Sequence, residues 1–109
     1  MSDGLAITRR AGWTTIPDES AFGSIGFRFS RRDLIVLRRP VGPLSWDILL
    51  IIEVNVVTGA WGYVVLDENT GEPYDYELAI PAICSRFTGE VDEAFAELRE
   101  YGFIGVGLV

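Results

Sequence analysis

Residues 46–66 read WDILLIIEVNVVTGAWGYVVL, and this stretch decides the fold. In its first half the even positions are apolar, and the polar residues Asp47, Glu53 and Asn55 all fall at odd positions. Because successive side chains of a strand point to opposite faces, the even face can pack on a core while the odd face borders water. A helix would scatter the three polar residues around its circumference. The stretch therefore predicts a β-hairpin that turns at Thr58 and Gly59.

The register of this hairpin has two solutions. A two-residue loop joins Trp61 and Tyr63 to the apolar face, but such turns require a positive φ that β-branched residues resist. A three-residue loop over 57–59 is sterically easier and sets Val54 opposite Gly62. A slip of one residue exchanges the two faces of a strand. We favour the three-residue loop, which places Trp61 and Tyr63 on the polar face as a candidate binding surface with aromatic anchors, although core packing is the simpler interpretation of such aromatic residues.

The rest of the chain alternates in short segments before its period changes. Alternation and Gly or Pro punctuation predict short strands over 5–10, 13–16, 25–30, 34–39 and 103–109, with residues 21–26 irregular. Apolar residues at helical spacing then predict a short helix over 80–87 and a longer one over 90–101, with a break at Thr88 and Gly89. Gly102 is placed to cap the longer helix. We therefore expect a single α+β domain over residues 1–109, a mainly antiparallel sheet with the two C-terminal helices packed on it.

The composition favours binding over chemistry. The chain has a formal net charge of −7, one cysteine, no histidine and no lysine, so the usual general base, Schiff-base amine and imidazole ligand are missing. We expect no enzyme, no cofactor and no metal. Apolar residues make up 49% of the chain, which suggests that a second subunit covers part of the surface. No apolar run is long enough to span a membrane, and Met1–Gly4 lacks the character of a signal peptide, so we expect a cytoplasmic protein.

The charges are unevenly distributed. Residues 1–50 contain seven arginines and five acidic residues, whereas residues 51–109 contain two arginines and eleven acidic residues. Such asymmetry permits two electrostatic faces and head-to-tail association. An acidic stripe at helical spacing is one candidate binding face, although a solvated helix face is the simpler interpretation: Glu90, Glu93, Glu97 and Glu100.

Arginine doublets form a second set of candidate binding residues. Adjacent residues of a strand face opposite ways, so each doublet presents one arginine to any one surface. Ion pairing with the acidic half is the simpler interpretation, and a net charge of −7 opposes binding to phosphates. The alternative is nucleic-acid association through the arginine-rich half, carried by Arg31, Arg32, Arg38 and Arg39.

Acidic residues between the hairpin and the helices could pair as carboxylates. Asp67 with Glu68, or Asp75 with Glu77, would suit an enzyme or a small-ligand site if they converged in a pocket. The segment lacks the spacing of a calcium loop, and we interpret it as a turn. The favoured function is therefore binding to another protein, with the chain as a homodimer, in an immunity, inhibitor or assembly role.

Overall fold

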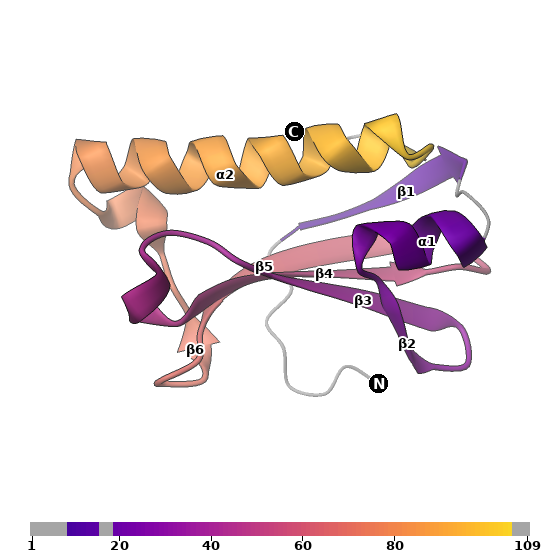
Figure 1. Ribbon diagram of the computed structural model, residues 1–109, viewed down its shortest axis with the longest axis horizontal. Helices are drawn as coiled ribbons and strands as arrows, with labels where there is room; N and C mark the ends of the chain where they lie inside the picture. Colours follow the sequence, from indigo (N-terminus) through magenta and orange to yellow (C-terminus); the bar gives the residue numbers. More distant parts are fainter. Residues whose placement is uncertain (1–8, 16–18, 106–109) are drawn as a thin grey trace.

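The computed structural model describes residues 9–15 and 19–105, in which one long helix lies along an antiparallel sheet (Figure 1). The spatial order of the strands is β2-β3-β4-β5-β1-β7, and β6 also pairs with β5. Two single-turn helices, η1 and η2, precede β4 and α2. The elements are β1 (Arg9–Thr15), α1 (Glu19–Ile25), β2 (Arg28–Arg31), β3 (Leu34–Pro40), η1 (Leu44–Trp46), β4 (Ile48–Asn55), β5 (Ala60–Asp67), β6 (Glu72–Pro73), η2 (Tyr76–Leu78), α2 (Pro81–Glu100) and β7 (Ile104–Gly105).

The α+β class predicted from the sequence is confirmed, with local corrections. Residues 9–15 form one strand, so the break expected at Gly12 is wrong. Residues 21–25, which were expected to be irregular, lie within α1. The expected strands over 5–10, 13–16 and 103–109 lie partly outside the described residues.

The central hairpin forms as predicted, but its register differs from both expected solutions. Val54 pairs with Trp61 and Ile52 with Tyr63, which leaves a four-residue loop over 56–59. The predicted three-residue loop, with Val54 opposite Gly62, is therefore wrong. Because the loop has an even number of residues, Trp61 and Tyr63 share the face of Val54.

Asn55 is the physical reason for the longer loop. Its side-chain Oδ1 accepts hydrogen bonds from the backbone N–H groups of Val57 and Thr58 at 2.9 and 3.0 Å. Its carbonyl oxygen accepts the N–H of Gly59 at 2.8 Å, and Gly59 takes a φ of +77°. The glycine thus supplies the positive φ, and no β-branched residue in the loop has to adopt it.

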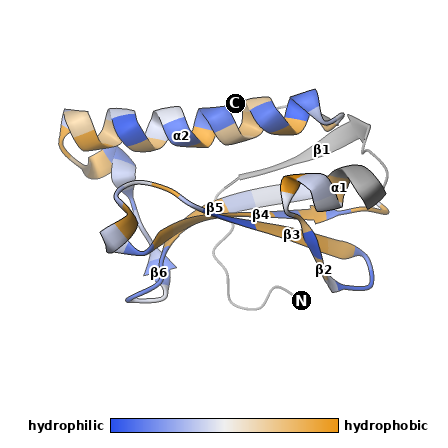
Figure 2. Ribbon diagram, viewed as in Figure 1, coloured by the Kyte–Doolittle hydropathy of each residue, from blue (hydrophilic) through white to orange (hydrophobic). Residues whose placement is uncertain are grey.

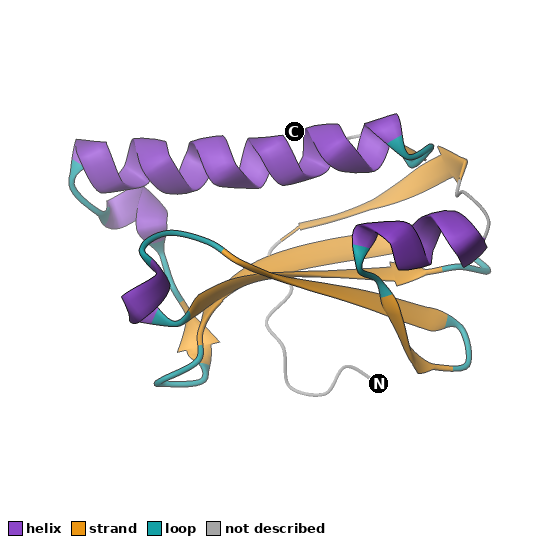
Figure 3. Ribbon diagram, in the orientation of Figure 1, coloured by secondary structure: helices purple, strands orange, loops and turns teal. Residues whose placement is uncertain are grey.

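The helix α2 is continuous from Pro81 to Glu100, so the predicted break at Thr88 and Gly89 is wrong (Figure 3). Glycine inside a helix costs about 1 kcal/mol relative to alanine. The free energy gained by burying one apolar stripe at helical spacing outweighs that cost, because the stripe continues on both sides of the glycine. Its members are Phe87, Val91, Ala94, Phe95 and Leu98.

Both ends of α2 follow their sequence signals. Pro81 occupies the first turn, where its missing N–H removes no helical hydrogen bond. Gly102 caps the other end with a φ of +102°, and the N–H of Phe103 reaches back to the carbonyl of Leu98 at 3.0 Å. Within the described residues, no helix has the length and apolar character needed to cross a membrane.

The apolar layer between the sheet and α2 forms the main core. Figure 2 shows apolar and polar residues alternating along α2 above largely apolar central strands. The core side of β4 presents Ile48, Leu50, Ile52 and Val54, all buried. The opposite face of the sheet was expected to border water, but it holds a second, smaller cluster of Val36, Ile51 and Val64 with partly buried Leu34, Leu49 and Leu66.

Candidate binding surfaces

The aromatic pair Trp61 and Tyr63 is not an exposed binding face. Only 4% of Trp61 and 6% of Tyr63 is exposed, so the interpretation of both as an outward aromatic surface is wrong. Both rings pack on Phe95 of α2, with ring centroids 5.2 Å apart in each case. The four-residue hairpin loop turns them toward the helix, and they serve as core side chains.

Two of the four glutamates in the acidic stripe of α2 bond to other parts of the chain, and the other two are exposed. Glu97 forms an ion pair with Arg39 of β3, and Glu90 accepts the N–H of Gly42 at 3.0 Å while also pairing with Arg86. These two glutamates, seven residues apart, attach the helix to β3 and to the segment that follows it. Glu93 and Glu100 are exposed and remain the acidic residues of the stripe that a partner could reach.

The four candidate arginines do not form one patch. Arg38 and Arg39 take opposite faces of β3, as their adjacency predicts: Arg38 is exposed, whereas Arg39 lies on the core face beside Glu97. Arg31 ends β2, and Arg32 follows in the turn before β3. Both are exposed, and with Arg28 they make this end of the sheet basic.

An apolar surface that we did not predict lies at the opposite end of β3. We call it the apolar end, and it consists of Leu44 and Trp46 of η1 together with Leu78 and Ile80 around η2. The exposed fractions are 81% for Leu44, 84% for Leu78, 68% for Ile80 and 38% for Trp46. Figure 1 places the two single-turn helices and the start of α2 at the same end of the molecule.

Buried and half-buried aromatic rings pack beside Trp46 of the apolar end. Phe87 of α2 contacts Trp46, Tyr74 and Tyr76, with centroid distances of 6.3, 5.3 and 5.6 Å. Asn69 donates a hydrogen bond to the carbonyl of Trp46 at 3.2 Å, which ties η1 to the turn after β5. These contacts hold Trp46 and η1 against α2 and the turn after β5.

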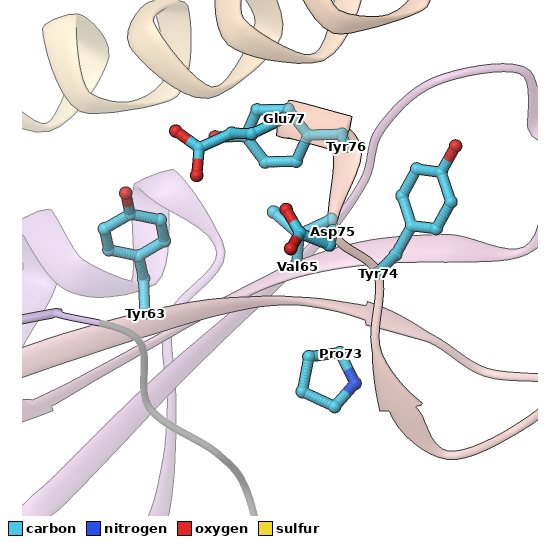
Figure 4. A pocket seen from close by; sticks show the side chains of 7 residues that line it. All are labelled: Tyr63, Val65, Pro73, Tyr74, Asp75, Tyr76 and Glu77. Carbon is cyan, nitrogen blue, oxygen red and sulfur yellow. The ribbon is translucent and has the colours of Figure 1, made fainter. Parts of the chain in front are cut away.

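A cavity of about 220 Å³ lies beside this end, at the edge of β5 (Figure 4). Its described lining is formed by Tyr63, Val65, Pro73, Tyr74, Asp75, Tyr76 and Glu77. Asp75 and Glu77, one of the two carboxylate pairs considered from the sequence, thus border a concave site. Asp67 and Glu68, the other pair, are absent from the described lining.

The sequence carried only a partial signal for either surface. Single-turn helices have no hydrophobic period, so nothing in residues 44–46 or 76–80 indicated exposed apolar side chains. The cavity depends on the turn that pairs Leu66 with Pro73, and its described lining falls within residues 63–77. Among the described residues, no group of three or more acidic or cysteine side chains is arranged to hold a metal ion.

Comparison with known proteins adds a likeness of fold. No protein-family model and no curated protein matches the chain. A solved structure of a DUF1831 family protein from Lactobacillus plantarum resembles it with a TM-score of 0.63 and 17% sequence identity, over 94% of this chain and 98% of that one. The chain therefore shares the α+β fold of that protein.

Proposed function

We propose that this protein acts by binding protein, not by catalysis, and that it forms a homodimer through the apolar end. The observation that carries the proposal is the exposure of three aliphatic side chains, Leu44, Leu78 and Ile80, by more than two thirds each. Exposed apolar groups rimmed by polar residues mark interaction sites in soluble proteins. The partner at this surface is a second copy of the chain.

The charge distribution around the apolar end bears on how two copies can meet. Residues 67–77, close to the apolar end, contain five acidic residues and no basic one, whereas residues 28–33, before the start of β3, contain three arginines and one aspartate. Contact between the apolar ends of two copies closes with two-fold symmetry and brings both acidic segments toward one interface. Burial of the aliphatic side chains, and not charge attraction, therefore holds the proposed dimer together.

Light scattering coupled to size-exclusion chromatography at micromolar concentration tests the proposal. The expected mass is twice the 12.1 kDa of one chain. The double variant Leu44→Asp/Ile80→Asp is expected to run as a monomer, because burial of two carboxylates in an apolar contact is costly. Both side chains are largely exposed in the single chain, so the fold should tolerate the change.

Val57→Asp is the matched control. Val57 is also apolar and 72% exposed, but it lies in the β4–β5 loop, at the other end of β4 from η1. We expect this variant to remain dimeric. A wild-type mass of one chain at every concentration would refute the dimer. Equal dissociation in the two variants would refute the assignment of the interface to the apolar end.

Nucleic-acid association is the second candidate, favoured only by the exposed arginines at the β2–β3 end. Arg28, Arg31 and Arg32 are all exposed there. If they bind phosphates, retention on a nucleic-acid column should fall steeply as salt rises. An absence of retention at low salt excludes this candidate.

A further inference from the structure

Two acidic residues border the apolar end on its η1 side. Asp47 directly follows Trp46 and ends η1 in the left-handed region, with a φ of 56°. Its carbonyl accepts the backbone N–H of Glu68 at 3.0 Å, so Glu68 is held beside η1. The next residue, Asn69, donates from its side chain to the carbonyl of Trp46. Both acidic side chains are exposed. Short contacts to the backbone therefore place two acidic residues next to the exposed apolar side chains.

Within the described part of the chain, no basic side chain offsets these two carboxylates. Neither of them takes part in an ion pair there. Residues 41–85, which include the whole apolar end, contain seven acidic residues and no basic one. The arginines that flank this range pair with other acidic residues: Arg39 with Glu97, and Arg86 with Glu90. The border of the apolar end therefore carries negative charge that no described arginine neutralises.

Two-fold contact places this charge opposite itself. An isologous dimer presents the same patch from both copies, so burial of Leu44 and Trp46 brings Asp47 and Glu68 of each copy to the rim of one contact. Like charges at this rim repel over about one Debye length, which is ~30 Å at 0.01 M salt and ~8 Å at 0.15 M. The burial of aliphatic side chains involves no charge and is not screened. Added salt therefore removes repulsion and leaves the apolar contact in place.

We propose that ionic strength regulates the dimer, and that the contact between apolar ends tightens as salt rises. This inference rests on the proposed dimer. Four like-charge pairs about 10 Å apart in water lose enough repulsion between ~0.01 M and ~0.15 M salt to lower the dissociation constant about threefold. A contact between oppositely charged surfaces shows the opposite dependence, because salt weakens attraction. The sign of the salt dependence thus separates contact between two apolar ends from contact of an acidic segment with an arginine-rich one.

Sedimentation equilibrium in sodium chloride at these two concentrations measures the effect. For the wild-type chain we expect a dissociation constant about threefold lower at the higher concentration. The double variant Asp47→Asn/Glu68→Gln should dimerise more tightly than the wild type at low salt, and its dissociation constant should change little with salt. Asparagine suits a left-handed backbone and Glu68 is exposed, so the fold should tolerate both changes.

Asp92→Asn/Glu93→Gln is the matched control. It removes the same two charges from the exposed side of α2, and Asp92 lies ~18 Å along the helix from Ile80. This variant should respond to salt as the wild type does. Equal loss of the salt effect in both variants would assign the repulsion to the overall charge and overturn the inference. A wild-type dissociation constant that stays constant or rises with salt would overturn it too, while the dimer itself stands. Absence of dimers in the wild type and in Asp47→Asn/Glu68→Gln at both salt concentrations would refute the proposed dimer, and the inference with it.

Discussion

Gly42 provides a direct measure of how tightly the end of the sheet packs on α2. Its φ is +70°, and a Cβ at this position would lie 2.3 Å from Cζ of Phe87. The Phe87 ring is fully buried and contacts the rings of Trp46, Tyr74 and Tyr76, so it has little room to retreat. Gly42→Ala combines a left-handed backbone cost of ~1–2 kcal/mol with an overpacking cost of ~1–3 kcal/mol. We expect the free energy of unfolding to fall by about 2–5 kcal/mol.

Gly71→Ala separates the two contributions. Gly71 has a similar φ of +75°, but no atom lies within 4 Å of the position that a Cβ would take there, so only the backbone cost of ~1–2 kcal/mol applies. Urea unfolding followed by tryptophan fluorescence gives both values by linear extrapolation. Adding Phe87→Leu to each variant should recover part of the loss in Gly42→Ala and none in Gly71→Ala. Equal losses in the two alanine variants would refute the close contact between Gly42 and Phe87.

Three further changes test the hairpin, the helix and the link between α2 and the sheet. Gly89→Ala should raise the free energy of unfolding by up to ~1 kcal/mol, because its surroundings are open and the helix is continuous there; a decrease in urea unfolding would contradict that continuity. Asn55→Ala should lower it by ~1 kcal/mol through loss of two loop hydrogen bonds, with Val57→Ala as a control near zero. A double-mutant cycle on Arg39 and Glu97 should give a coupling free energy below ~1 kcal/mol, because solvent screens a pair whose side chains are 28% and 43% exposed, respectively. A coupling free energy above ~2 kcal/mol would argue against solvent screening of this pair.

The sequence predicted the strands well where burial alone decides them. Alternation over β4 placed Ile48, Leu50, Ile52 and Val54 on one buried face, because the side-chain period of a strand depends only on local geometry. The register was harder to predict, because it depends on hydrogen bonds between the loop backbone and one side chain. Asn55 accepts two backbone hydrogen bonds and lengthens the turn to four residues. The turn preferences of threonine and glycine take no account of such hydrogen bonding by a neighbouring side chain.

The helix shows the reverse conflict, in which packing overrides a local signal. Thr88 and Gly89 are poor helix residues, and together they predict an interruption. Both are exposed, however, while Phe87 and Val91 on either side are buried in the same stripe. A break would remove one half of the stripe from the sheet. Tertiary burial worth several kcal/mol therefore decides the outcome over a propensity cost of about 1 kcal/mol.

The cavity is local in sequence, because its described lining falls within residues 63–77. Asp75 and Glu77 are similar in kind to the other acidic residues of their segment, and composition alone indicates a turn. The pairing of Leu66 with Pro73 folds this segment back on β5, and the N–H of Tyr74 donates to the carbonyl of Val65 at 2.8 Å. The concave shape then depends on where the chain leaves β5 to form η2 at Tyr76–Leu78, and a single-turn helix has no hydrophobic period that could reveal this position in the sequence.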